Sequence, residues 1–298
     1  MLNKDSVYLG IAPIGWTNDD MPHLGEENTF EQCISEAALA GFEGTEIGNK
    51  YPTDPVELKE KMALRGLRVA NQWFSTTLCT ESYEENEKAF IKQLDFLEKA
   101  GANRINVCEI SRNIIAEAVP MFGEMKPVAT DEEWDKLCDG LNRLGKIATQ
   151  RGFKLCFHHH MATVVQTVDE VKRLLDNTNP EFIYLCYDSG HFTLSGEDPV
   201  AACHLFVDRI GHVHLKDIRK QEMDEAIAKD LTFRQTVLAN CFTVPGDGFV
   251  DFVGIFDCLS ENDYQGWLLV EAEQDPAISN PFEYAVKARK YIKETINI

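Results

Sequence analysis

The sequence lacks a long hydrophobic run, a basic cluster and a secretory leader. No apolar stretch approaches the roughly 20 residues that a membrane-crossing helix needs. The N-terminal segment MLNKDSVYLGIAPIGW has neither the basic start nor the apolar core of a signal peptide. With 29 Lys and Arg against 49 Asp and Glu, the net charge is −20. Such a chain repels polyanions, so we expect neither nucleic acid nor a membrane as a partner.

Paired-cysteine motifs are also missing. The nine cysteines are an odd number, widely spaced, with no CxxC pair, and several fall inside apolar runs. Cysteine in such runs behaves as a small buried hydrophobe, and unpaired cysteines are typical of a reducing compartment. The sequence therefore predicts a cytoplasmic protein without a disulfide framework.

A GxGxxG dinucleotide fingerprint, a linker rich in Pro, Gly or Ser, and low-complexity tracts are absent as well. What recurs instead is a helical stretch, a glycine or turn, and a short apolar strand, as in SEAALAGFEGTEIG and IATQRGFKLCFHH. Helix starts are marked by Asp54-Pro55, Asp198-Pro199 and Asn280-Pro281, and by a capping box at 167–170. This uniform organisation predicts one domain over residues 1–298.

Counting the apolar runs gives eight strands, with a closing helix at 281–296. The strands are expected at 7–11, 43–47, 67–73, 103–108, 153–158, 183–188, 210–215 and 267–271. Eight strand–helix units in this length predict an α/β fold, a closed (β/α)8 TIM barrel. An open doubly wound sheet is the alternative. The two longest connections, 109–131 and 216–251, are expected to cover the mouth of the barrel.

Polar side chains collect at the carboxyl ends of these strands, where the active site of such a barrel lies. Because side chains two apart on a strand share a face, the alternation directs one polar side chain from each of the last four strands inward: His158, Asp188, His214 and Glu271. Two imidazoles with two carboxylates favour Mn, Co, Fe or Zn over Ca or Mg. The pattern predicts a divalent metal site, although each histidine alone is more typical of a satisfied core residue.

The strand-end series Asp188-x-x-His191, His214-x-Lys216 and Glu271 resembles the xylose-isomerase-like barrel superfamily, whose members hold a divalent metal there. Longer stretches along the whole chain are similar to the inosose dehydratase family: GIAPIGWTNDD, GFEGTEIG, HHHMATVVQT, YDSGH, HVHLKD, TVPGDG and VEAEQDPAISNP. One departure separates the chain from the isomerases and epimerases of the superfamily. They carry glutamate at the position of His158 and use two glutamates on opposite faces of the substrate.

The resemblance implies a hydro-lyase of myo-inositol catabolism. Its substrate would be the cyclitol ketone 2-keto-myo-inositol (scyllo-inosose), which loses water to give 3D-(3,5/4)-trihydroxycyclohexane-1,2-dione. The resemblance also implies Mn or Co as the metal, and glutathione as a further requirement. No motif marks a glutathione site, and Cys108 is a loose candidate for thiol chemistry. Barrels of this type often assemble, so a homo-oligomer stays open.

Dehydration next to a ketone needs a base for the α-proton and an acid for the departing β-hydroxyl. Lys216 is a candidate base if its pKa is depressed; alternatively it binds a substrate oxygen or forms a salt bridge with Asp188 or Glu271. His191 and His160 are candidate acids, or groups that orient a ligand or a hydroxyl. Glu46 is a candidate base or polyol-binding group, or a plain rim carboxylate.

Four further residues are candidates for substrate binding. Trp16 and Trp73 would offer apolar faces to the C–H side of a cyclitol, although aromatic residues in barrels are more often core. Asn18 would reach substrate hydroxyls from the first loop, or make a turn. Glu109 is a weaker candidate for the same roles as Glu46. The rival functions are a ketose isomerase or 3-epimerase on the same barrel, and a non-catalytic polyol-binding barrel; His158 in place of glutamate counts against the epimerase.

Overall fold

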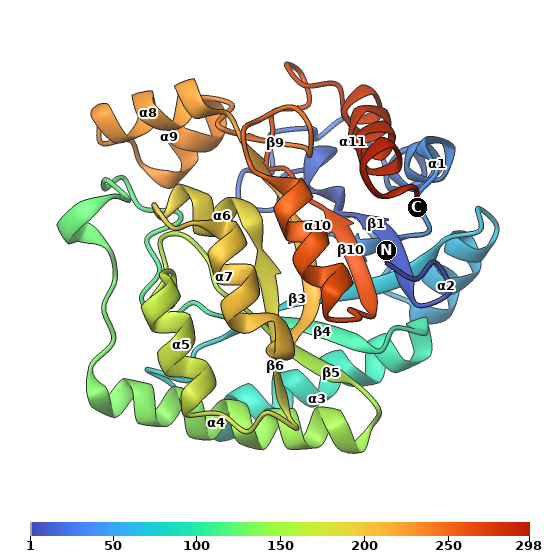
Figure 1. The fold of residues 1–298 in the computed structure, drawn as a ribbon. Coiled ribbons are helices and arrows are strands. Elements are labelled where there is room, and N and C mark those ends of the chain that lie inside the picture. Colours follow the sequence, from blue (N-terminus) through green and yellow to red (C-terminus); the bar gives the residue numbers. More distant parts are fainter. Residues whose placement is uncertain (1) are drawn as a thin grey trace.

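Short apolar runs form eight parallel strands that close into a barrel in the computed structural model, which describes residues 2–298 (Figure 1). The strand order is β1-β10-β7-β6-β5-β4-β3-β2, and β1 pairs with both β10 and β2. The barrel strands are β1 (Val7–Ile11), β2 (Gly44–Ile47), β3 (Arg68–Thr76), β4 (Arg104–Glu109), β5 (Lys154–His158), β6 (Ile183–Asp188), β7 (Ile210–Leu215) and β10 (Gly266–Val270). The predicted TIM barrel is confirmed, and the open-sheet alternative is wrong because the sheet has no free edge.

Helices surround the barrel and begin at the predicted caps. They are α1 (Phe30–Ala40), α2 (Pro55–Ala63), α3 (Tyr83–Ala100), α4 (Asp131–Gln150), α5 (Val168–Asp176), α6 (Ser189–Leu194), α7 (Pro199–Phe206), α8 (Lys220–Ala228), α9 (Phe233–Leu238), α10 (Phe252–Glu261) and α11 (Pro281–Ile296). The side chains of Asp54, Asp198 and Asn280 accept backbone N–H bonds at the starts of α2, α7 and α11. Thr167 and Glu170 form the predicted capping box of α5.

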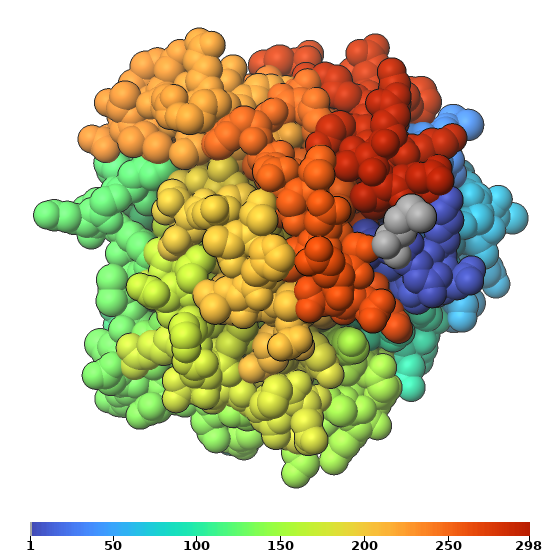
Figure 2. Space-filling view, viewed as in Figure 1, coloured from blue at the N-terminus to red at the C-terminus, as the bar shows by residue number. Residues whose placement is uncertain are grey.

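The two long connections meet at one edge of the barrel mouth. The segment after β7 carries α8 and α9, and a two-stranded antiparallel pair that sequence periodicity did not predict, β8 (Asp217–Ile218) with β9 (Phe242–Thr243). The backbone N–H of Met121, in the connection after β4, donates to the carbonyl of Leu231, 3.3 Å away, between α8 and α9. Figure 2 shows the two segments side by side, green below orange.

Apolar side chains fill the layer between the strands and the helices, whereas the inside of the barrel near its mouth is polar. Buried residues on inward positions include Asn71, Asn106, His158, His212 and His214. In the same part of the chain, residues 2–298, no helix is long and apolar enough to cross a membrane. The polar interior leads directly to the candidate site.

Candidate active site

A cavity of about 360 Å³ opens where the barrel strands end. Its volume is at the small end of the range of ligand sites, and suits a six-carbon ring. Four of the predicted site residues line it: Glu46, Trp73, His160 and Glu271. Ile110, Asn113, Ile115 and Ala116 show that the connection after β4 reaches the cavity as expected, whereas the connection after β7 contributes no residue to this lining within the described chain.

The four predicted metal ligands lie together beneath this cavity. One ligand atom from each of His158, Asp188, His214 and Glu271 falls within 4.8 Å of the others, and all four residues are buried. His158 Nε2 lies 3.1 Å from His214 Nδ1, and Asp188 Oδ2 lies 3.5 and 3.6 Å from these two nitrogens. Glu271 Oε2 lies 2.5 Å from His214 Nδ1. The strand alternation therefore predicted correctly which side chains converge.

These four residues fit a divalent cation. Asp188 Oδ2 is buried and has no hydrogen-bond partner within residues 2–298, although it faces two ring nitrogens. A buried carboxylate oxygen without a donor is costly unless a cation takes that place. Burial lowers the pKa of His158 to about 4, which keeps this imidazole neutral, the form that binds a metal.

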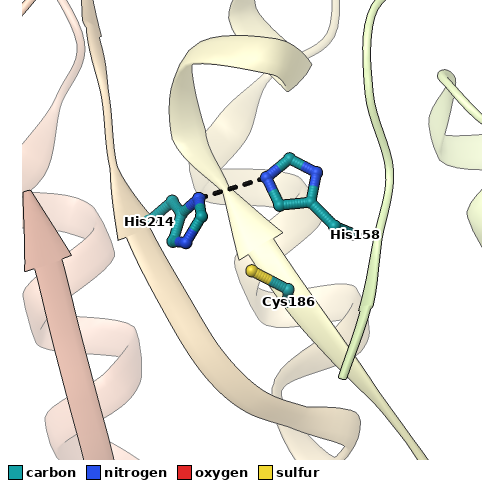
Figure 3. A group of neighbouring side chains, drawn as sticks. All are labelled: His158, Cys186 and His214. Carbon is teal, nitrogen blue, oxygen red and sulfur yellow. Dashed lines mark hydrogen bonds between the residues drawn. The ribbon is translucent and has the colours of Figure 1, made fainter. Parts of the chain in front are cut away.

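Cys186 lies beside His158 and His214 in the barrel, two residues before Asp188 on β6 (Figure 3). Burial raises the pKa of the Cys186 thiol to about 11. A thiol that stays protonated at neutral pH is a poor ligand, so the carboxylate of Asp188 completes the better donor set.

Lys216 forms the salt bridges that the sequence left as its alternative role. Its ammonium Nζ lies 2.9 Å from Glu271 Oε1, 3.4 Å from Glu273 Oε2 and 3.5 Å from Asp188 Oδ2. Burial alone would lower the pKa of Lys216, but the surrounding carboxylates raise it well above its ordinary value. Three carboxylates surround this one ammonium, so its contacts support the salt-bridge role that the sequence left open.

His191 contacts Lys216 and does not line the cavity. Its Nε2 lies 2.9 Å from Lys216 Nζ, its Nδ1 accepts a long hydrogen bond of 3.4 Å from the Met161 N–H, and the ring is fully buried. Neither His191 nor Lys216 belongs to the lining of the cavity in the described chain. Of the two roles considered for His191, the geometry favours orientation of its neighbours over proton transfer to substrate.

Glu46 and His160 are the predicted proton-transfer candidates that reach the cavity. Burial raises the pKa of Glu46 to about 7, against the influence of His214 nearby. Asn71 Nδ2 donates to Glu46 Oε1 at 2.7 Å, which leaves Oε2 free of side-chain donors. His160 Nδ1 lies 2.7 Å from the carbonyl of Met161, so this nitrogen donates to the carbonyl and Nε2 is the nitrogen left for a substrate group.

Glu273 is a site residue that the sequence reasoning missed. It lies two positions after Glu271, is 2% exposed, and lines the cavity beside His160. Its Oε1 lies 3.7 Å from His160 Nε2. The shared parity of Glu271 and Glu273 was the signal that could have found it. Asp19 and Asp20 also line the cavity, from the loop after β1.

Three predicted substrate-binding residues are directed elsewhere by local partners. Trp16 is 1% exposed, and its indole N–H donates to Glu36 at 2.5 Å. Asn18 Oδ1 accepts the backbone N–H groups of Asp20 and Met21, which makes it a turn residue. Glu109 accepts bonds from Thr76 Oγ1, the Leu78 N–H, and the N–H and hydroxyl of Ser111. None of the three is in the lining that the described residues form. The contacts of Trp16 and Asn18 match their alternative roles as a core residue and a turn residue.

His159, which lies between His158 and His160 in the sequence, points away from the cavity. Its Nε2 accepts the backbone N–H of Asp188 at 3.2 Å, and its ring stacks on Phe192 with the centroids 3.7 Å apart. All nine cysteines are buried and unpaired. Burial raises the pKa of Cys108 well above its ordinary value, so this enclosed thiol offers no reactive thiolate to glutathione.

Comparison with known proteins agrees with this architecture. Residues 34–295 match the family model described as xylose isomerase-like TIM barrel. An inosose dehydratase of Clostridium tetani (strain Massachusetts / E88) is 54% identical over 294 residues, covering 99% of each chain.

Two solved structures show the fold alone. The probable 3-DHS dehydratase AsbF of Bacillus anthracis has a TM-score of 0.70 at 15% identity and covers 96% of this chain and 98% of its own. The IOLI protein, solved with a zinc atom, has a TM-score of 0.71 at 15% identity, with 97% and 98% covered. On the family model and the level of identity, the chain belongs to the xylose isomerase-like TIM barrel family and, within it, to the inosose dehydratases.

Proposed function

We propose that the chain removes water from 2-keto-myo-inositol (scyllo-inosose) and yields 3D-(3,5/4)-trihydroxycyclohexane-1,2-dione. The observation that carries this proposal is the full-length match to inosose dehydratases, combined with a cavity lined by Glu46, His160 and Glu271. No Lys or Arg from residues 2–298 lines the cavity, whereas Asp19 and Asp20 do. Such a lining favours a neutral polyol ketone over a phosphorylated or carboxylated substrate.

A divalent cation is the second part of the proposal. His158, Asp188, His214 and Glu271 would hold it, and their two nitrogen and two oxygen donors favour Mn or Co over Mg or Ca. When bound, the cation polarises the ketone and so acidifies the adjacent C–H. Lys216 would keep Glu271 oriented through their 2.9 Å contact.

The proton transfers are assigned to the two groups that reach the cavity. Glu46 Oε2 would accept the α-proton, because Asn71 occupies only the other oxygen. His160 would donate its Nε2 proton to the β-hydroxyl as the C–O bond breaks, and the oxygen leaves as water. Trp73, at the cavity wall, would cover the C–H side of the ring. Each step uses a side chain that contacts the substrate space.

The same arrangement disfavours 3-epimerisation. Epimerisation removes a proton from one face and returns one to the other, which needs an acid or base on each. At the strand end where the epimerases would place a second glutamate, this chain has His158, whose Nε2 faces the ligand cluster. We also infer a reducing compartment, such as the cytoplasm, because all nine cysteines are buried and unpaired.

The test is conversion of scyllo-inosose to the unsaturated dione, followed by ultraviolet absorbance, before and after chelation and with Mn or Co restored. Chelation is expected to abolish conversion, and the restored metal to recover it. Conversion that survives complete metal removal would contradict the metal proposal. Tight metal binding with no conversion of scyllo-inosose, but with interconversion of a ketose, would replace the dehydratase by an isomerase or epimerase.

A further inference from the structure

Glu273 is unusual among the buried acids because it has no hydrogen-bond donor. Within residues 2–298, no N–H or O–H group donates to either of its oxygens, and Oε2 is fully enclosed. The nearest side-chain nitrogens are beyond good hydrogen-bond distance: Lys216 Nζ is 3.4 Å from Oε2, and His160 Nε2 is 3.7 Å from Oε1. A buried carboxylate is costly without donors, so the missing donor is expected from a ligand in the cavity.

The arrangement of His160 shows where that ligand would be held. Its Nδ1 is committed to the carbonyl of Met161 at 2.7 Å, which fixes the ring and leaves Nε2 directed towards Glu273. The edge of Trp73 packs against the same ring, with the centroids 5.8 Å apart. A distance of 3.7 Å between a ring nitrogen and a carboxylate oxygen in a cavity wall is too long for a direct hydrogen bond. A hydroxyl group in the cavity can contact both side chains from above, because its oxygen accepts from one while its hydrogen is donated to the other.

We infer that Glu273 and His160 hold the departing hydroxyl of the substrate between them, and so determine which hydroxyl is lost. This inference rests on the proposed dehydration. Glu273 Oε1 accepts the hydrogen of the β-hydroxyl, and His160 Nε2–H faces the lone pair of its oxygen. Glu46 first takes the α-proton, and the electrons of the α C–H bond remain as the enolate. These electrons then form the new C=C bond of the enol as the C–O bond breaks. The oxygen takes the His160 proton and leaves as water, and His160 is left neutral.

If Glu273 acts in this way, its removal should affect the loss of water but not the removal of the α-proton. A general loss of structure would affect both steps. Removal of the α-proton depends on Glu46 and the ligand cluster, whereas loss of water depends on Glu273 and His160. In D2O, a variant without Glu273 should therefore still exchange the α-hydrogen of scyllo-inosose for deuterium while it forms little dione. A general acid and its oriented leaving group contribute about 10²–10⁴-fold to such a step.

The experiment compares Glu273→Met and Glu273→Gln with the unsubstituted enzyme loaded with Mn or Co. Nuclear magnetic resonance in D2O follows deuterium incorporation and dione formation together, and metal content and the melting temperature are recorded for each protein. We expect Glu273→Met to keep total proton removal, exchange plus elimination, within about threefold while elimination falls at least about 100-fold. Glu273→Gln, which retains an acceptor oxygen, should recover part of that loss.

Asp217→Asn is the matched control, since Asp217 is a buried carboxylate outside the cavity that accepts four backbone N–H bonds. It should lower the melting temperature without changing the ratio of exchange to elimination. A parallel loss of exchange and elimination in Glu273→Met, or no loss of either, overturns the inference. Failure of the unsubstituted, metal-loaded enzyme to form dione would instead overturn the proposed function, so the two failures are distinguishable.

Discussion

Buried carboxylates lie after β7 in one region of the barrel mouth, and at the end of β6 and after β10 in another, and their hydrogen bonds differ. Asp217, after β7, accepts the backbone N–H groups of Ile218, Gly246, Gly248 and Val250. Asp188 and Glu273 each have a buried oxygen without a donor in the described chain. Since an unsatisfied buried group costs about 1–3 kcal/mol, the second region gives up stability that the first region keeps.

The buried acids of the two regions differ in their role. Those of the first stabilise the fold, whereas those of the second have an oxygen that a ligand would satisfy. Asp217 fixes the turn 244–250 and the start of β8. Glu109 likewise accepts N–H groups from the segments after β3 and β4. Around Asp188 and Glu273, the compensating charge comes from one buried ammonium, Lys216. Burial alone does not identify a functional acid; a buried carboxylate oxygen without a hydrogen bond does so better.

The largest effect is expected for His158→Ala. This change removes one of four ligands in the unsatisfied region, so metal content and turnover should be lost together. A loss of about 10³-fold or more corresponds to the several kcal/mol that a Lewis acid supplies to the barrier. Metal analysis after desalting and the dione assay measure both quantities. A variant that keeps full metal content and activity would show that the four residues are not a metal site.

Lys216→Met should have the next largest effect. Removal of the ammonium leaves Asp188, Glu271 and Glu273 without their common cation, and breaking a buried ion pair costs about 3–5 kcal/mol. Because a bound divalent metal supplies the missing positive charge, the loss of stability should be larger without metal than with it. Metal affinity should fall about 10–100-fold, as for other groups that orient ligands. Denaturant unfolding with and without Mn measures this, and equal losses in both states would contradict it.

Asp217→Asn should show the opposite pattern. The amide NH2 would replace one acceptor oxygen and face two backbone N–H groups, at about 1–3 kcal/mol for each. We expect a lower denaturation midpoint by the same amount with or without metal, and turnover within about threefold. Loss of metal from this variant would show that the region around Asp217 also supports the metal ligands. The two regions would then not differ in the way described.

Strand periodicity predicted most of the fold, because parallel strands buried on both faces appear in the sequence as short apolar runs. The predicted bounds differ from the observed ones by one residue at most, except that β3 continues to Thr76, three residues beyond the predicted end. The β8–β9 pair was not predictable, since each strand has two residues and no period. Backbone bonds to a distant carboxylate, Asp217, hold this segment, and such contacts leave no local signal.

The same logic explains which site residues were found. His158, Asp188, His214 and Glu271 lie on strands or directly after them, where alternation fixes the direction of a side chain. Trp16 and Asn18 lie in a loop, where direction depends on whichever partner is near. Glu109 ends β4 but turns to the N–H groups of Leu78, after β3, and Ser111, so its donors, and not its parity, decide its role.

The smallest effect on turnover is expected for His159→Phe, which changes the middle of three consecutive histidines. The phenyl ring can keep the stack on Phe192, while the Asp188 N–H loses its acceptor, at a cost of about 1–3 kcal/mol. Because this side chain faces away from the ligand cluster, metal content should be unchanged and turnover should stay within about threefold. His158→Ala, one residue earlier on the same strand, should lose both. If His159→Phe instead lost the metal and His158→Ala retained it, the direction of the strand end would be wrong by one residue. The difference between two adjacent, equally buried histidines would then have to come from something other than the face of the strand.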